Sequence, residues 1–491
     1  MNFKQFLALL GIFAFTVLIR WPNLDRPLSK HHEFVTAISL RVLQVWEQEG
    51  AGTFNWSPAM NYSGRANKFI DNHATSLHQV MDEHGNYYYT SHPPLAYILP
   101  HVFFTTFGLE ANVLNLQLFH LLINLLTAFI VVWIVKALNG SWRQQLLSYT
   151  IYLFLPAVLW FQSNTYMSDM LVHFFFALGI LVCIHLNNAM RKRTIVAYFL
   201  VIFAMIYTSW LGILFAAVSG TYFLFKVQRR SIFFVSLIAS VGALALIYLQ
   251  YSSINGSQAF LDQLSQRFSA RGSNSSDASY SFFRQKGYEV GLIAFNYIVN
   301  YASLIVLFVV ILFNRSTLKN VIQSNKMLFI LSVIPVILLH LLLLNYSGHD
   351  FTVLYLSLFI ALIAGKFLAE ISSKQATLTL ISIIVLGCAN YYVLNLPGDT
   401  SIKGDRYDVH LNQANYILEN STEHVDLFWE GQEVNPMVIV YCKRNIKTVT
   451  SIVEAKIWLG NPGDRVGYYF SGDSLYTVEE INNLFDFGRR H

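Results

Sequence analysis

Residues 111–138 read ANVLNLQLFHLLINLLTAFIVVWIVKAL, an almost continuous apolar block of 28 residues. A helix needs roughly 20 apolar residues to cross the hydrocarbon core of a bilayer, so this block is long enough to span a membrane. The chain of 491 residues is 54% hydrophobic and 12% charged, whereas soluble domains are about 25% charged. This composition excludes a soluble enzyme and predicts a polytopic membrane protein. The other apolar segments lie at 3–20, 94–109, 144–162, 167–187, 194–208, 210–226, 231–250, 287–313, 326–345, 350–371 and 376–394.

The cations predict which ends of these segments face the cytoplasm, because cytoplasmic loops retain Lys and Arg. They cluster at 191–193, 226–230, 315–326 and 366–374. If all four clusters and Lys4 are cytoplasmic, the loops 21–93 and 251–286 and the tail are external. Twelve regular crossings do not allow this arrangement. Pro156 interrupts segment 144–162, and a proline breaks a helix, so this segment is expected to re-enter or split, giving 11 or 13 crossings.

The polar tail predicts a separate domain over 396–491, after a membrane domain over 1–395. Residues 397–491 hold 14 of the 28 Asp and Glu residues but only 9 Lys and Arg. A helix is expected near Leu411–Glu419, with strands at Val438–Tyr441, Thr448–Ile452 and Val466–Phe470 and turns at 461–463 and 471–473. The expected fold is mostly α, a polytopic helical bundle with a small external α/β domain.

Two polar motifs stand at the external ends of membrane segments. His31, His32 and Glu33 follow the first segment, and Phe34–Gln48 has the pattern of an amphipathic helix lying at the membrane interface. Glu33 is either a functional carboxylate held at the membrane surface or a helix-start acid favoured by the helix dipole. His92 precedes two prolines at the entrance of segment 94–109, where it either points into a site or caps the helix.

The motifs together resemble the GT-C glycosyltransferases, in particular the protein O-mannosyltransferase and aminoarabinose transferase group. The likeness extends over most of the membrane region. The motifs that carry it are His32-Glu33, the His-Pro-Pro-Leu entrance at 92–95, Tyr-Met-Ser-Asp at 166–169, Thr-Ser-Trp at 208–210 and Ser-Gly-His-Asp-Phe at 347–351.

The resemblance implies an inverting transfer of a sugar from a polyprenyl-phosphate donor to a hydroxyl of a protein or glycolipid at the external membrane face. Glu33 would be the general base, with His32 beside it, and Asp169 would position donor or acceptor. Arginine and lysine suit the leaving phosphate. The candidates for binding the donor phosphate or sugar are Arg65, Lys68, His92, Arg271, His349 and Asp350.

Alternatives remain from the sequence alone. The same superfamily includes metal-dependent enzymes that transfer a pre-assembled glycan or cell-wall polymer, and a lipid or solute transporter has similar hydropathy. The resemblance implies no cofactor and no divalent metal, and the sequence has no basic stripe with interleaved aromatics, so no nucleic-acid partner is expected. We expect an enzyme of the bacterial inner membrane with a cytoplasmic N-terminus.

Overall fold

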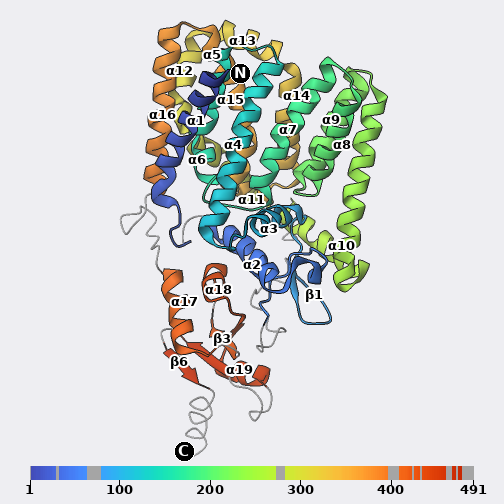
Figure 1. Cartoon of the computed structure of the whole chain (residues 1–491), viewed down its shortest axis with the longest axis vertical. Coiled ribbons are helices and arrows are strands. Elements are labelled where there is room, and N and C mark those ends of the chain that lie inside the picture. The colour runs from blue at the N-terminus through green and yellow to red at the C-terminus, as the bar shows by residue number, and fades with distance from the viewer. Residues whose placement is uncertain are drawn as a thin grey trace, which may run out of the picture. The chain divides into compact units, whose positions relative to one another are not determined.

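The computed structural model describes residues 2–28, 32–63, 79–272, 282–395, 409–422, 425–431, 434–459, 467–471 and 474–477. The chain divides into two compact units (Figure 1). Unit 1 comprises residues 1–25, 116–248 and 264–404, and unit 2 comprises 26–115, 249–263 and 405–491.

The described residues of unit 1 form helices joined by short loops, with no strand among them. Its helices are α1 (Phe3–Arg20), η1 (Trp21–Asn23), α4 (Val113–Ala137), α5 (Trp142–Phe154), α6 (Pro156–Phe161), α7 (Ser168–Asn188), α8 (Lys192–Ile206), α9 (Leu211–Thr221), η3 (Tyr222–Lys226), α10 (Arg230–Arg271), α11 (Phe282–Asn300), η4 (Ala302–Leu304), α12 (Ile305–Phe313), α13 (Arg315–Ser324), α14 (Lys326–Leu342), η5 (Tyr346–Gly348), η6 (Asp350–Leu356), α15 (Ser357–Glu370) and α16 (Ser373–Asn395). The first residues of α4 and the middle of α10 belong to unit 2.

The membrane character expected from composition is confirmed. Six helical stretches in the described ranges are long and apolar enough to cross a membrane, or up to eight if each of two bent helix pairs forms one span. The chain is therefore a multi-pass integral membrane protein. The six are fewer than the apolar segments in the sequence, because several segments form helices of 10–17 residues or bend in the middle.

Segment 144–162 splits at its proline, as expected. Leu155 adopts extended backbone angles (φ −64°, ψ 131°) between α5 and α6, because the ring of Pro156 clashes with helical angles at the residue before it. The fully buried Arg20 donates to two carbonyl groups of the short helix α6, with Nε 3.0 Å from Leu159 O and Nη2 3.2 Å from Val158 O.

Helix α10 extends well beyond the apolar segment 231–250. Residues 251–271 of the second predicted loop are also helical, apart from a kink at Asn255 and Gly256. Gly256 has φ +83°, a left-handed conformation that favours glycine. The sequence prediction ended this helix too early, because hydropathy falls at residue 251 while the helical backbone continues.

Close helix packing in unit 1 depends on small residues. A Cβ added at Gly365 of α15 would lie 2.0 Å from Ser148 Oγ and 2.7 Å from Ser148 Cα of α5, and one at Gly387 of α16 would lie 2.3 Å from Phe154 O. Small side chains let membrane helices approach this closely.

Unit 2 combines helices with two small sheets. Its elements are α2 (Glu33–Glu49), η2 (Ala51–Phe54), β1 (Gln79–Met81), β2 (Tyr87–Tyr89), α3 (Leu95–Phe107), α17 (Val409–Asn420), β3 (Asp426–Glu430), α18 (Pro436–Cys442), β4 (Ile446–Val449), α19 (Ile452–Leu459), β5 (Gly467–Ser471) and β6 (Ser474–Thr477). The four-stranded sheet has the order β4-β3-β5-β6, with β3 parallel to β4 and β5, and β6 antiparallel to β5.

One hydrophobic core of unit 2 joins the first loop to the tail. It contains Val42 and Trp46 of α2 together with Ile439 and Cys442 of α18. Two hydrogen bonds of 3.0 Å also link Asn445 to the backbone of Tyr62. The domain boundary at residue 395 remains a prediction, since these contacts connect segments on both sides of it.

The α/β character of the tail agrees with the sequence, with one correction. Helix α17 and strand β5 lie where a helix and a strand were expected, and β4 begins two residues before the expected strand. The prediction of a strand at Val438–Tyr441 is wrong, because these residues belong to α18. Asn435 caps this helix by accepting from Met437 N (3.0 Å), and Pro436 starts its first turn. The turn at 461–463 and most of that at 471–473 lie outside the described residues.

Asp82 organises the hairpin between β1 and β2. Its Oδ1 accepts from the amides of His84 and Asn86 (2.9 Å each), and its Oδ2 accepts from Asn86 Nδ2 (2.9 Å) and the Tyr88 hydroxyl (2.8 Å). Burial raises the pKa of Asp82, but these hydrogen bonds lower it more, so that the pKa lies below its usual value of 3.8. The turn is therefore held by an ionised carboxylate.

Candidate functional site

Glu33 is the first residue of α2 and is completely buried. Arg26 binds both of its carboxylate oxygens, with Nη2 2.6 Å from Oε1 and Nη1 2.9 Å from Oε2. The Arg26 side chain is 9% exposed, so both charges lie away from water. These two hydrogen bonds fix the orientation of the Glu33 carboxylate.

His32 immediately precedes Glu33 in a strained conformation. Its φ of 60° and ψ of 6° are left-handed, which is uncommon for a residue other than glycine. The imidazole is buried, and its ring centroid lies 5.9 Å from that of Phe34. This backbone geometry turns the chain into α2 directly at Glu33, so the expected neighbours His32 and Glu33 share one buried corner.

Helix α2, predicted as amphipathic, is confirmed as a helix but is buried on almost every side. Ile38, Val42, Val45 and Trp46 are buried as the pattern predicts, whereas Phe34 is 38% exposed. Polar side chains of this helix are buried as well, namely Thr36, Ser39, Arg41 and Gln44. Within unit 2, α3 and α18 pack against this helix.

His92 is also buried, at the entrance to α3. Its carbonyl accepts from the hydroxyl of Tyr251 (2.6 Å), and the nearby Thr90 hydroxyl donates to Gln263 Oε1 (2.6 Å). The His92 ring lies 6.2 Å from the ring of Tyr89. The corner before the two prolines is therefore anchored to the part of α10 that belongs to unit 2.

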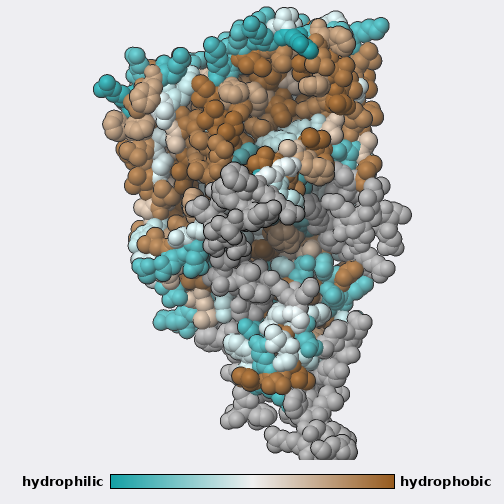
Figure 2. Space-filling view, turned by 180° about the vertical axis from the view of Figure 1, so that it is seen from behind, coloured by the Kyte–Doolittle hydropathy of each residue, from teal (hydrophilic) through white to brown (hydrophobic). Residues whose placement is uncertain are grey.

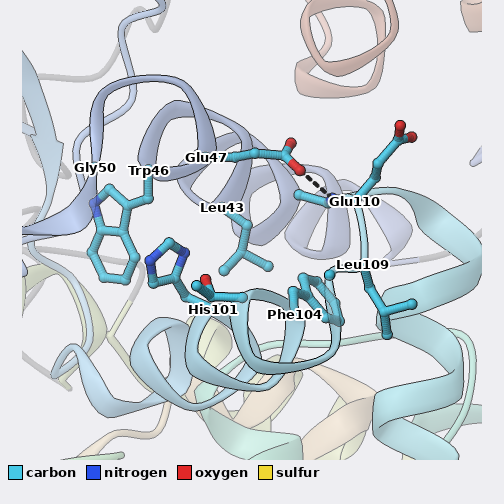
Figure 3. Close-up of a pocket in the computed structure, with 11 residues that line it drawn as sticks. Leu43, Trp46, Glu47, Gly50, His101, Phe104, Leu109 and Glu110 are labelled. Atoms are coloured by element: carbon cyan, nitrogen blue, oxygen red, sulfur yellow. Dashed lines mark hydrogen bonds between the residues drawn. The ribbon is translucent and has the colours of Figure 1, made fainter.

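A groove of about 410 Å³ lies between α2 and α3 (Figure 3). Trp46 and His101 line it with their ring centroids 5.4 Å apart, and Phe104 adds apolar surface. Glu47 accepts from the amide of Ala111 (3.3 Å) at the far end. The sequence analysis did not identify this groove, because its lining comes from two helices whose pairing no local motif reveals.

Asp169 has three hydroxyl donors in unit 1. It lies in the first turn of α7 and is 2% exposed. Tyr346 donates to Oδ2 (2.6 Å), Tyr355 donates to Oδ1, and the Ser168 hydroxyl lies 3.3 Å from Oδ2. Hydrogen bonds to a charged acceptor and the helix N-terminus both stabilise a buried carboxylate. Asp169 is thus a rigidly held acid.

Arg271 and His349 meet Asp169 through Tyr346. The guanidinium carbon of Arg271 lies 5.1 Å from the centroid of the Tyr346 ring, a distance typical of a cation–π contact. The His349 ring stands edge-on to Tyr346 at 5.8 Å and stacks on Phe351 at 5.2 Å with an interplanar angle of 7°. Three residues expected from the sequence, Asp169, Arg271 and His349, therefore surround one tyrosine.

The loop that carries His349 is held by side chains of α11 that contact its backbone. Asn296 of α11 donates to Gly348 O (2.8 Å), and a Cβ at Gly348 would approach Leu292 at 3.2 Å. Asp350 follows as the first residue of η6 and is half-buried. The motif from Ser347 to Phe351 thus presents His349 at the surface of unit 1 and Asp350 next to it.

Comparisons with known proteins give structural likeness without sequence likeness. No family model matches the chain, and no curated protein matches its sequence. The structure is similar to that of ArnT from Cupriavidus metallidurans bound to undecaprenyl phosphate, at 13% identity over 94% of this chain and 92% of that one, with a TM-score of 0.63. It is also similar to the oligosaccharyltransferase AglB from Archaeoglobus fulgidus in complex with an inhibitory peptide and a dolichol-phosphate, at 9% identity over 91% of this chain and 65% of that one, with a TM-score of 0.55.

Both neighbours are members of the GT-C superfamily. The chain has the GT-C fold. At 13% identity the likeness to ArnT concerns the fold, and in this respect the resemblance inferred from the sequence motifs is confirmed. The apo form of the same ArnT gives a similar TM-score of 0.61 over 94% of the chain.

Within this GT-C fold, the roles of the individual residues stay predictions. Arg65 and Lys68 lie outside the described residues. The sequence analysis missed Arg26, Tyr346 and Tyr355; only Arg26 is near its partner in sequence, as a cation seven residues before Glu33. In the described ranges, no group of three or more His, Cys, Asp or Glu side chains is placed to hold a metal ion.

Proposed function

We propose that this chain is an integral-membrane glycosyltransferase that moves a sugar from a polyprenyl-phosphate donor to a hydroxyl of a protein or glycolipid at the external membrane face. The observation that carries the proposal is the GT-C fold, shared over 94% of the chain with an ArnT whose structure contains undecaprenyl phosphate. Two buried carboxylates, Glu33 and Asp169, support it, because a buried charge is costly unless it is paired or hydrogen-bonded, and such groups are typical of functional sites.

Glu33 is the proposed general base of an inverting displacement. The acceptor hydroxyl oxygen would bond to the anomeric carbon while its proton moves to the Glu33 carboxylate. The bond between the anomeric carbon and the phosphate oxygen breaks, and the polyprenyl phosphate leaves with the electron pair. Arg26 would hold the carboxylate in one orientation through its two hydrogen bonds, so that little reorganisation is needed at the moment of proton transfer.

Asp169 and Arg271 are proposed to act on the donor. Arg271 supplies a planar cation suited to a phosphate, and the ring of Tyr346 lies against it. Tyr346 is itself held by Asp169, which makes Asp169 a positioning residue in this proposal. His349, exposed beside the same tyrosine, would contact the phosphate or the sugar.

The proposal can be tested with the purified full-length protein in lipid nanodiscs. Native mass spectrometry would measure binding of undecaprenyl phosphate and dolichyl phosphate, and turnover would be followed with the lipid-linked sugars extracted from the host membrane. We expect binding of one of these lipids and a loss of turnover of at least about 100-fold in Glu33→Gln, since general base catalysis typically contributes 10²–10⁴-fold. Arg271→Gln should weaken phosphate binding.

Glu47→Gln is the matched control, because Glu47 lies on the same helix α2 and an amide oxygen can still accept from Ala111 N. It should retain wild-type turnover. Full turnover by Glu33→Gln would refute the assignment of the base, and failure to bind either polyprenyl phosphate would refute the proposed donor class.

A further inference from the structure

Helix α13 is nearly perpendicular to α14, the helix that follows it. It spans Arg315–Ser324, and its axis is bent by 85° from that of α14 at a single-residue break. If α14 crosses the membrane as part of a span, a helix at nearly a right angle to it runs along the membrane surface. The hydrophilic residues at the top of Figure 2 gather at the end of the bundle where Figure 1 labels α13 and α5.

The two faces of α13 differ in character. Arg315 and Lys319 are four residues apart, so they lie on the same face of the helix, and both are exposed. Val321, on the opposite face, is fully buried, whereas Ile322 is 40% exposed and lies on the same face as the cations, three residues after Lys319. Phe313, at the end of α12 immediately before α13, is 84% exposed. Exposed cations next to exposed apolar side chains are typical of helices that bind a membrane interface.

The surroundings of α13 are strongly basic. No Asp or Glu occurs between Glu289 and Asp350. Lys366 of α15, which packs on α13, donates to Ser324 at 2.9 Å. The one acid of α15 is Glu370 at its end, where Arg143 donates to the carbonyls of Leu368 and Ile371 at 3.2 Å each. Further exposed cations of this region are Lys326 at the start of α14 and Lys374 in the first turn of α16.

We propose that α13 is a binding site for anionic phospholipid at the bilayer surface. Arg315 and Lys319, with Lys326 beside them, would bind the lipid phosphates, while Phe313 and Ile322 would insert between the lipids. Each basic residue near an anionic membrane surface contributes about 1 kcal/mol of binding, and the exposed apolar side chains add to it. This site does not depend on the proposed glycosyltransferase activity.

Native mass spectrometry of the full-length protein in detergent would measure the affinity for phosphatidylglycerol and, separately, for phosphatidylcholine. The double variant Arg315→Gln/Lys319→Gln should bind phosphatidylglycerol roughly 30-fold more weakly, the factor expected from two basic residues. Its affinity for phosphatidylcholine should not change. The matched control is Lys192→Gln/Arg193→Gln, which removes two exposed cations from the start of α8.

An equal loss in the control would show a general effect of charge and would overturn the proposal, as would unchanged binding by the α13 variant. A second measurement is independent of affinity. A fluorophore attached to Ile322→Cys in nanodiscs should be quenched by brominated lipids and protected from water-soluble quenchers. Free access of iodide to this position would contradict contact with the bilayer. If the protein transfers sugar but does not bind phosphatidylglycerol, the lipid site at α13 is refuted and the proposed glycosyltransferase function is not.

Discussion

The Arg26–Glu33 pair should contribute strongly to the stability of unit 2. The side chains are 9% and 0% exposed, and two hydrogen bonds of 2.6 and 2.9 Å connect them. Replacing Arg26 with Met removes both hydrogen bonds and leaves the Glu33 carboxylate buried. Breaking a buried ion pair from one side costs about 3–5 kcal/mol, so Arg26→Met should destabilise unit 2 by this amount.

Cys442 offers a probe of this unit. It lies in the same core as helix α2, and burial raises the pKa of its thiol to about 12, so the folded protein should react slowly with thiol reagents. The segment after Arg26 is tied to the same helix as Cys442, because the amide of Leu28 donates to the Tyr441 hydroxyl (2.6 Å). Labelling of Cys442 therefore reports the opening of the structure around the ion pair.

The assay uses a variant in which Cys442 is the only cysteine, and it follows the rate of maleimide labelling in detergent. A loss of about 3–5 kcal/mol corresponds to labelling roughly 100 to 3,000 times faster, since 1.4 kcal/mol is a factor of ten. Glu33→Gln should have a smaller effect, because its amide oxygen can still accept from Arg26. In the double variant Arg26→Met/Glu33→Gln, the losses of stability from the two substitutions should not add, and the coupling energy between them should be about 1–3 kcal/mol. A less than threefold acceleration in Arg26→Met, or strictly additive effects, would refute this reasoning.

Three other changes have defined outcomes. Tyr346→Phe removes one of the hydroxyls that donate to Asp169 and should lower stability by about 1.5–3 kcal/mol together with donor binding; unchanged thermal unfolding and donor affinity would contradict this. Gly365→Ala places a methyl group against Ser148 and should lower stability by about 1–3 kcal/mol, whereas an unchanged melting temperature would show that the two helices separate easily. The pKa of Asp82 is lowered in the folded state, so its contribution to folding stability is complete above pH 3.8 and is lost as the pH falls through the folded value. Asp82→Asn should therefore remove this part of the acid sensitivity in a pH titration of unfolding. An unchanged pH profile would contradict the role of Asp82.

The sequence predicted the membrane class and the main apolar helices well, because hydropathy is a local property. It was less successful where a helix continues into polar residues, as α10 does beyond residue 250. It also failed at Val438–Tyr441, because a short apolar run fits a buried strand and a buried helix equally well. The cap from Asn435 decides between them in the structure.

The candidate acids were identified from their position at the start of helices, but their partners were not. Tyr346 and Tyr355 are 177 and 186 residues from Asp169 in sequence, and only the tertiary fold brings their hydroxyls to it. The core that joins α2 to α18 is equally invisible in the sequence, because no local pattern pairs an amphipathic helix in the first loop with a helix in the tail.

The proposed sugar transfer is tested most directly in the host, by mass spectrometry of lipid-linked sugars and glycoconjugates in a strain that lacks this gene. We predict that one polyprenyl-phosphate-linked sugar accumulates and that one glycosylated protein or glycolipid disappears. The wild-type gene should restore the product, and a stably produced Glu33→Gln variant should not. Unchanged lipid-linked sugars and glycoconjugates in the deletion strain, or full restoration by Glu33→Gln, would contradict the account.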